Sequence, residues 1–298
     1  MSVNLISTLG VVLASILFGL VPFFAKNLTE QGIPAAAIVF YKYSLTALVL
    51  LPFLRIKKDT LSALFWGIFA GIALGFGQIG YVVALKSAPV STVGLLYMTF
   101  PMFTLVITWL WIGIRPTHRE LIGAVLIFIA AIIALSPSFN EEHQLLTLLL
   151  SLTAPLGLAV SITTLTNKLI DFSPVARAGC LSIGCVIAML PVILSLGTHK
   201  IIPASVMGRW LIIGITVITC LIPLFLYALN APRIGAAKSA IAGGFELPTM
   251  FMVGWIAFDE SISMVQLIAG AIIIFAIVTT PPRSSKDDNE SYDNISDT

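Results

Sequence analysis

The sequence is poor in charged residues. They make up only 10% of its 298 residues, whereas 58% are hydrophobic; a typical soluble domain is about 25% charged. Surface-to-volume scaling leaves a soluble domain too little interior to bury so many apolar side chains. A soluble globular fold is therefore excluded, and lipid is the expected surrounding. The formal net charge of +2 and the lack of a basic run give no reason to expect a nucleic-acid partner.

Residues that usually carry catalysis or bind metals are also scarce. The cysteines lie inside apolar runs without ligand-type spacing, and the histidines fall in predicted loops: Cys180, Cys185, Cys220, His118, His143 and His199. The apolar runs hold no nucleophile with a base, no metal cluster and no paired carboxylates. We therefore expect no enzyme, no metal and no cofactor. Residues 1–20 lack a basic start and a small-x-small site, so we expect part of a membrane helix there instead of a cleaved signal.

Long apolar runs make up most of the chain. A helix needs about 20 mostly apolar residues to cross a bilayer. Ten segments qualify: 5–25, 34–54, 61–85, 91–112, 119–135, 145–169, 174–196, 208–229, 236–258 and 264–280. Several hold an internal proline, including Pro101 and Pro248, at which we expect interrupted or bent helices. The pattern predicts an all-α integral membrane protein with ten transmembrane helices.

The basic residues divide unequally between alternate loops. With the N-terminus inside, the inner loops and tail hold Arg55, Lys57, Lys58, Arg115, Arg119, Lys168, Arg177, Arg233, Lys238, Arg283 and Lys286. The outer loops hold Lys26, Lys86, Lys200 and Arg209. Cytoplasmic loops carry the excess of Lys and Arg. We expect a multi-pass protein of the cell membrane, the inner one in a Gram-negative cell, with both termini cytoplasmic.

The two halves of the sequence resemble each other. Ala-Leu-Lys, Phe-Pro-Met-Phe-Thr and Leu-Ile-Gly-Ala follow one another within residues 84–128, and Ala-Leu-Asn, Glu-Leu-Pro-Thr-Met-Phe and Leu-Ile-Ala-Gly-Ala within 228–275. The offset is 144 residues at the first landmark (84 to 228) and about 146 or 147 at the others. A duplicated unit of five helices enters the membrane from opposite sides, which makes an inverted repeat. We expect one repeat over 1–139 and the other over 140–282. The acidic, nearly aliphatic-free tail 283–298 is expected to be disordered and cytoplasmic.

These features resemble the EamA-type transporters of the drug/metabolite transporter superfamily, over nearly all of residues 5–280. The resemblance rests on Ser15–Lys26, on Phe40-Tyr41-Lys42-Tyr43, and on Phe245-Glu246-Leu247-Pro248 through Asp259-Glu260. Two features depart from the family: the first-half copy ends Gly113-Ile114-Arg115 without an acid, and Pro248 sits one residue late. The resemblance implies a basket of ten helices whose cavity is walled mainly by the first, third, fourth, sixth, eighth and ninth.

Charged residues within the spans are candidates for the site. Glu246 is the only acid deep within a predicted span, and Lys42 and Lys238 lie nearer to helix ends. Buried ionisable groups in membrane helices are usually functional or paired. Glu246 is therefore expected to bind substrate or couple transport to protons, with Lys42 and Lys238 as its cationic counterparts. The alternatives are a structural hydrogen bond of Glu246 beside Pro248 and lysines that snorkel to the interface.

Polar and aromatic side chains in the presumed cavity helices complete the site. The expected substrate-binding residues are Phe18, Phe23, Gln78, Tyr81, Tyr97, Ser161, Thr164, Thr219, Tyr227 and Glu246. Gln78 and Tyr81 are three residues apart and hence share a helix face. Against this, a single Thr or Ser within a helix more often bonds its own backbone than a ligand.

The combined reading is a secondary transporter, which we expect to export an amino acid or a related metabolite by alternating access between the repeats. Other substrates of the superfamily, such as a nucleotide, an S-adenosyl compound or a choline-like cation, stay open as alternatives. So do a non-transporting membrane interaction protein and a membrane-embedded enzyme. The expected partners are the lipid bilayer and a small-molecule solute, and a homodimer is left open.

Overall fold

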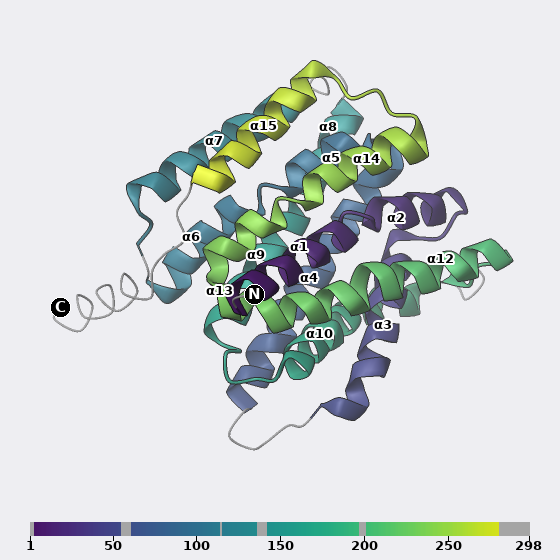
Figure 1. Ribbon diagram of the computed structural model, residues 1–298. Coiled ribbons are helices and arrows are strands. Elements are labelled where there is room, and N and C mark those ends of the chain that lie inside the picture. Colours follow the sequence, from purple (N-terminus) through teal and green to yellow (C-terminus); the bar gives the residue numbers. More distant parts are fainter. Residues whose placement is uncertain (1–2, 55–60, 114, 136–141, 197–200, 280–298) are drawn as a thin grey trace.

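Helices and the turns between them make up the described chain. The computed structural model describes residues 3–54, 61–113, 115–135, 142–196 and 201–279, and no β-strand occurs in these ranges (Figure 1). The helices are α1 (Val3–Phe18), α2 (Val21–Glu30), α3 (Ala35–Leu50), η1 (Leu51–Phe53), α4 (Leu61–Ser87), α5 (Val90–Tyr97), α6 (Phe100–Ile112), α7 (His118–Leu135), α8 (Glu142–Ser151), α9 (Thr153–Asn167), α10 (Pro174–Ser195), α12 (Val206–Thr216), the π-helix η4 (Val217–Leu221), α13 (Ile222–Gly243), α14 (Glu246–Phe258) and α15 (Met264–Thr279). The expected repeat boundary at 139/140 and the tail 283–298 lie outside the described residues.

Within the described part of the chain, six helical stretches are long and apolar enough to cross a membrane: Leu5–Glu30, Leu61–Ser87, Val90–Ile112, Leu146–Asn167, Pro174–Ser195 and Val206–Ile234. Shorter apolar helices accompany them: Ala35–Leu50, Glu120–Ile133, Glu246–Phe258 and Met264–Ala276. An all-α membrane protein is therefore the architecture, as expected. The number of ten crossings stays a prediction.

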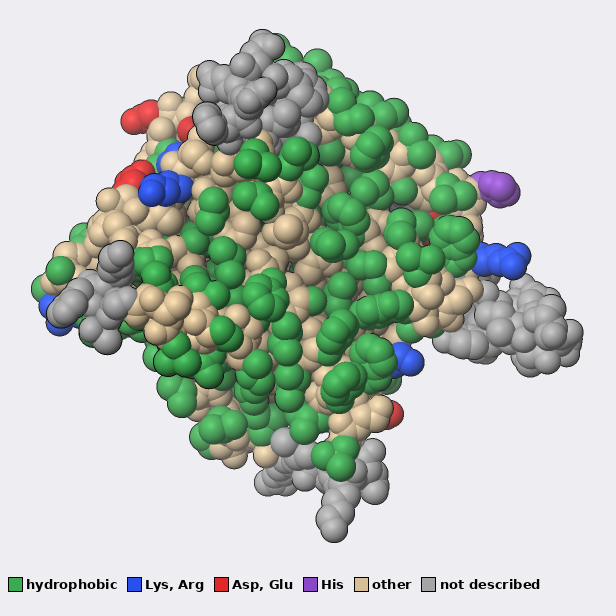
Figure 2. Space-filling model, turned by 180° about the vertical axis from the view of Figure 1, so that it is seen from behind, with side chains coloured by type: hydrophobic (Ala, Val, Ile, Leu, Met, Phe, Trp, Pro, Cys, Tyr) green, Lys and Arg blue, Asp and Glu red, His purple; other side chains and the backbone are tan. Residues whose placement is uncertain are grey.

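Many large hydrophobic side chains are exposed on the outer surface. Hydrophobic side chains cover the middle of the face seen in Figure 2, and charged side chains gather toward its edges. Leu48, Phe65, Leu110, Leu194 and Trp255 are each more than half exposed. Contiguous exposed apolar surface of this extent is costly in water. It suits contact with lipid tails.

Four of the expected spans are interrupted near a proline. A turn at Gly19–Leu20 separates α1 from α2, one at Met98–Thr99 separates α5 from α6, one at Leu152 separates α8 from α9, and one at Gly244–Phe245 separates α13 from α14. Each following helix carries Pro within its first three residues. Backbone N–H groups in the first turn have no acceptor within the helix, so proline costs no hydrogen bond there. The interruptions expected near Pro101 and Pro248 are confirmed.

Helix α13 contains a corner that we did not expect. We expected a loop at 230–235, but the backbone stays helical there, so that expectation was wrong. A straight helix separates residues eight positions apart by about 12 Å along its axis. Yet the Ser239 hydroxyl donates to the Ala231 carbonyl over 3.3 Å. The helix therefore bends sharply around Pro232, and the chain changes direction without leaving helical backbone.

The central helices pack closely through glycine. Helix α4 contacts both α9 and α10, α1 runs along α13, α3 packs on α10, and α7 packs on α15. A Cβ on Gly71 would lie 2.8 Å from the Gly184 Cα and closer still to the Leu181 carbonyl oxygen. No side chain fits in that gap, so α4 and α10 touch backbone to backbone. The other glycines of 67–80 make similar close approaches: a Cβ on Gly77 would overlap the Thr153 carbonyl oxygen of α9.

Candidate functional site

One interior cavity of about 70 Å³ lies between the helices of the two halves. Residues of α1, α2, α3, α4, α5, α6, α9, α10, α13 and α14 line it. Ligand pockets commonly measure about 300–1,000 Å³. The described state thus offers room for several water molecules, and an organic solute would require the cavity to widen.

Most of the residues named from the sequence face this one cavity. They are Phe18, Lys42, Gln78, Tyr81, Tyr97, Ser161, Tyr227 and Glu246. They come from α1, α3, α4, α5, α9, α13 and α14, so residues far apart in the chain meet at one place.

The interrupted helices open onto this cavity. Val21 begins α2, Tyr97 ends α5, Phe100 begins α6, Gly243 ends α13 and Glu246 begins α14, and all five line the wall. Interrupted membrane helices leave free backbone groups and helix ends at the break. Transporters use such breaks to bind substrate near the middle of the membrane.

The charged side chains of Lys42 and Glu246 face the cavity. Lys42 and Glu246 are 4% and 6% exposed, and they attract each other across the space. Among the described residues, neither side chain forms a hydrogen bond or an ion pair, and the Lys42 ammonium lies 5.2 Å from the Tyr43 ring centroid. Burying an unpaired charge in a membrane protein costs several kcal/mol, on the order of 2.5 or more. Charged residues buried in membrane proteins at such a cost are usually functional.

Aromatic rings form much of the remaining wall. The Tyr81 and Tyr97 centroids are 5.2 Å apart, and those of Tyr97 and Phe100 are 6.3 Å apart. Phe18 and Tyr227 meet edge to face at 6.4 Å. Aromatic faces attract cations such as ammonium groups. The rings and the Glu246 carboxylate together favour a cationic group.

Hydrogen bonds hold several of these side chains in place. The Tyr81 hydroxyl donates to the Met250 sulfur over 3.9 Å. The Ser161 hydroxyl lies 3.0 Å from both the Ala70 and the Gly157 carbonyl oxygens. The Ser161 hydroxyl therefore donates to the backbone, although Ser161 lines the cavity.

Other residues named from the sequence lie elsewhere. Phe23 is 37% exposed and packs on Phe24 outside the cavity. The Thr219 hydroxyl donates to the Ile215 carbonyl over 2.6 Å, which is the backbone bond typical of a helical threonine. Thr164 is buried beside the cavity wall, not in it, and its hydroxyl has no partner in the described chain. The Lys238 side chain is outside the described residues.

Two aromatic wall residues were not among those named. Tyr43 follows Lys42 directly, and Phe100 lies between the break at Met98–Thr99 and Pro101. Both had a signal in the sequence, since one belongs to Phe-Tyr-Lys-Tyr and the other begins the helix after a predicted break.

Comparison with known proteins places these features in context. Residues 5–136 match the EamA-like transporter family. Over 111 residues the chain is 29% identical to an S-adenosylmethionine uptake transporter of Rickettsia bellii and 30% identical to one of Rickettsia felis. Each match covers 35% of this chain and 38% of the relative, so the chain spans little over a third of the length of these relatives.

Two matches extend over nearly the whole chain. An uncharacterized transporter of Archaeoglobus fulgidus is 24% identical over 275 residues, which are 90% of this chain and 94% of the relative. A crystal structure superimposes with a TM-score of 0.64 over 92% of this chain and 96% of its own, at 16% identity. The latter shows a shared fold alone.

Proposed function

We propose that this chain, an EamA-type transporter of the drug/metabolite transporter superfamily, carries a small metabolite with both an ammonium and a carboxylate group. The family match and the named relatives make it a transporter and not an enzyme, with a small-molecule solute and the membrane lipid as its partners. The substrate class, the route and the mechanism are our proposal.

The observation that carries the proposal is the pair Lys42 and Glu246. Both charges are buried in the wall of one cavity, and neither is paired among the described residues. A substrate carboxylate near Lys42 and a substrate ammonium near Glu246 would neutralise both at once. Free amino acids carry this pair of groups, and so do larger aminocarboxylates. A neutral solute would leave two unpaired charges in a low-dielectric site, which binding cannot offset cheaply.

S-adenosylmethionine is a second candidate, which the aromatic wall favours. It joins an aminocarboxylate to a sulfonium cation, and cations bind well over the faces of tyrosine and phenylalanine. Three matched Rickettsia proteins are named for uptake of this metabolite. Those names give no support to the export direction that the sequence suggested.

We further propose that transport proceeds by movement of two inverted repeats of five helices. The breaks at Met98–Thr99 and Gly244–Phe245 are 146 residues apart (98 to 244), the offset of the sequence repeat. In that register α3 corresponds to α10 and α7 to α15, and each of these pairs packs together. Contacts between equivalent elements are expected around a two-fold axis, and these contacts support alternating access.

Thermal stabilisation of the purified protein by a metabolite panel tests the substrate class. A ligand at 100 times its Kd stabilises the native state by about 2.7 kcal/mol. We expect neutral and basic amino acids or S-adenosylmethionine to raise the Tm, and sugars and nucleotide sugars to leave it unchanged. Flux of the best ligand into proteoliposomes then tests transport. Stabilisation by neutral sugars without any effect of aminocarboxylates would contradict the proposal.

A further inference from the structure

Three short helices run from the cavity to a common point on one face of the protein. Helix α2 starts at the cavity with Val21 and carries Lys26 one turn further on, and α5 ends at the cavity with Tyr97 and begins at Val90. Helix α14 starts at the cavity with Glu246 and is followed by Glu260. At 1.5 Å per residue, the far ends of α5 and α14 lie about 10–18 Å from the cavity.

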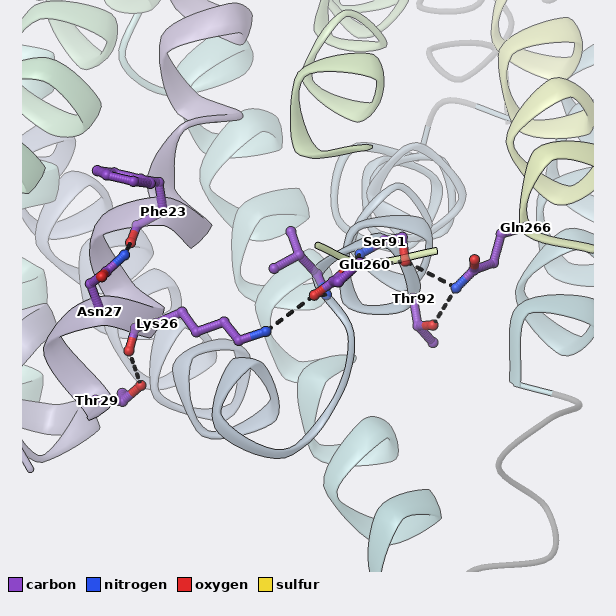
Figure 3. Close-up of polar contacts among 9 residues, drawn as sticks. Phe23, Lys26, Asn27, Thr29, Ser91, Thr92, Glu260 and Gln266 are labelled. Atoms are coloured by element: carbon purple, nitrogen blue, oxygen red, sulfur yellow. Dashed lines mark hydrogen bonds and ion pairs between the residues drawn. The ribbon is translucent and has the colours of Figure 1, made fainter. Parts of the chain in front are cut away.

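Glu260 joins these far ends. Its Oε1 accepts from the Lys26 ammonium at 3.1 Å and from the Val90 backbone N–H at 2.8 Å, and its Oε2 accepts from the Ser91 N–H at 3.3 Å (Figure 3). One carboxylate therefore pairs with α2 and caps the first turn of α5, where a negative charge is favoured. Lys26 also lies 4.3 Å from the Phe258 ring centroid at the end of α14.

The turn after α14 aims Glu260 back at the other two helices. Asp259 takes a left-handed conformation with φ of 50°, which folds the chain so that the Glu260 N–H donates to the Gly254 carbonyl over 3.0 Å. A Cβ on Gly254 would lie 2.7 Å from Glu260 Oε2. Glycine at this position therefore leaves room for the carboxylate.

A second set of hydrogen bonds adds α15 to the same point. The Gln266 amide donates to the hydroxyls of Ser91 and Thr92 at 3.0 and 2.9 Å (Figure 3). Between this point and the cavity α5 and α14 are in tight contact, because a Cβ on Gly94 would lie 2.8 Å from the Met250 sulfur. A solute has no room to pass between them in this state.

We propose that α2, α5 and α14 form a gate over the cavity and that the Lys26–Glu260 ion pair is its latch. The structure is then the state closed on this face, which the loop charges predict to be the outer one. Opening requires Lys26, and α2 with it, to separate from Glu260. Glu260 itself either keeps its hydrogen bonds to α5 or moves away with α14. The inference rests on the proposed transport function, since a gate serves only a protein that admits a solute.

The latch belongs to one face only. In the repeat register, with its offset of 146 residues, the sequence has Ile114 where Glu260 follows α14. A carboxylate that both pairs with a lysine and caps a helix is thus absent at the equivalent place. The two gates of an alternating-access cycle would differ in what holds them shut.

Accessibility of a cysteine in the cavity tests the latch without knowledge of the substrate. Ser15 lines the cavity and is nearly isosteric with cysteine, and the three native cysteines are buried and give the background. Labelling of Ser15→Cys by a membrane-impermeant cationic thiol reagent is timed in oriented vesicles. Lys86 is exposed in the last turn of α4, four residues before α5 begins at Val90, so Lys86→Cys identifies the face that carries the latch.

We expect Lys26→Met and Glu260→Gln each to speed the labelling from that face about tenfold, as for loss of a charged hydrogen bond. The glutamine oxygen still accepts from the α5 backbone, so this variant isolates the ion pair. The double variant should be no faster than the faster single variant, because both remove one interaction. Lys86→Met and Glu30→Gln, which change exposed charges outside the latch, should leave the rate unchanged.

Unchanged labelling in both latch variants, or rates that add in the double variant, would overturn the latch. Both variants can be checked for folding by their Tm. The labelling needs no ligand. A metabolite panel without any stabilising compound therefore does not affect the labelling result, and a negative labelling result does not affect the panel.

Discussion

Tyr81 and Tyr97 hold their rings 5.2 Å apart and tilted by 57° at the wall of the cavity, although they come from separate helices, α4 and α5. Each ring has a further neighbour: the Met250 sulfur accepts from the Tyr81 hydroxyl, and the Phe100 ring centroid lies 6.3 Å from that of Tyr97. A pair of rings held in this way is a preformed surface for a cationic group, since little side-chain freedom is lost on binding.

Replacing Tyr97 separates the ring from its hydroxyl. We expect Tyr97→Ala to weaken binding of a cationic ligand by up to about 30-fold, the range of a desolvated cation–π contact. Tyr97→Phe keeps the ring and should cost about tenfold or less. Phe23→Ala, outside the cavity, is the matched control and should leave the Kd unchanged. Equal losses for Tyr97→Phe and Tyr97→Ala in calorimetric titrations would assign the effect to the hydroxyl.

Proline 101 gives a test of movement at the helix break. It follows the turn at Met98–Thr99 within the first turn of α6, where alanine would allow an added backbone bond. We expect Pro101→Ala to favour a continuous α5–α6 helix and to slow transport several-fold while the Kd changes little. Single-turnover flux and equilibrium binding measure the two effects. An unchanged turnover would leave Pro101 as a packing feature.

Local pattern explains which features of the fold could be predicted. Apolar runs and prolines act on neighbours within a few residues, so the helical segments and the break before Pro101 could be predicted from the sequence. Helical spacing suggested that Thr219 shares a helix face with the cavity residue Tyr227. The Thr219 hydroxyl instead donates to the preceding turn of its own helix. Periodicity gives a face of a helix and does not show what a hydroxyl bonds there.

Long-range contacts were beyond such reasoning. Lys26 and Glu260 pair across 234 positions of sequence, and only the folded chain shows that Glu260 also caps α5. The corner at Pro232 escaped for another reason. Pro232, with Asn230, Arg233 and Gly235 close by, suggested a loop at 230–235. The backbone there stays helical, and the Ser239–Ala231 hydrogen bond lies across the bend.

The close contact of α4 with α10 predicts a sensitive position at Gly71. Its Cβ would overlap the backbone of α10, so Gly71→Ala should push the helices apart. Overpacking of this kind costs about 1–3 kcal/mol. We expect a lower Tm in detergent. Gly270→Ala is the matched control, because the nearest atoms to its Cβ would be side-chain atoms and not backbone: the Phe251 ring at 3.3 Å and the Leu247 Cδ2 at 3.6 Å. Equal Tm values for the two variants would show that α10 can move away from residue 71 without loss of stability.

The predicted topology can be tested by labelling from each side of the membrane. The loop charges place both termini in the cytoplasm and the 138–144 connection outside. Single cysteines in the tail and in that connection should therefore react with an impermeant maleimide from opposite faces of the membrane. Reaction of both from the same face would rule out ten crossings.

Glu246 gives the most direct test of the proposed site. It begins α14 at the cavity wall and has no hydrogen-bonding or charged partner among the described residues. We expect Glu246→Gln, which keeps size and removes charge, to weaken binding and transport of an ammonium-bearing solute about tenfold or more. The Tm should not fall, because an unpaired buried charge is lost. Glu30→Gln, on the exposed end of α2, is the matched control for a lost carboxylate.

Lys42→Met extends the same reasoning to the other end of the substrate. If Lys42 faces the carboxylate, Lys42→Met should weaken aminocarboxylates but leave simple amines, which lack a carboxylate, nearly unaffected. Glu246→Gln should weaken both classes, because both carry the ammonium. This crossed pattern requires a fixed orientation of the solute between the two charges, which a merely structural role of either residue does not produce. Wild-type flux from well-folded Glu246→Gln protein would instead leave Glu246 as a structural residue beside Pro248.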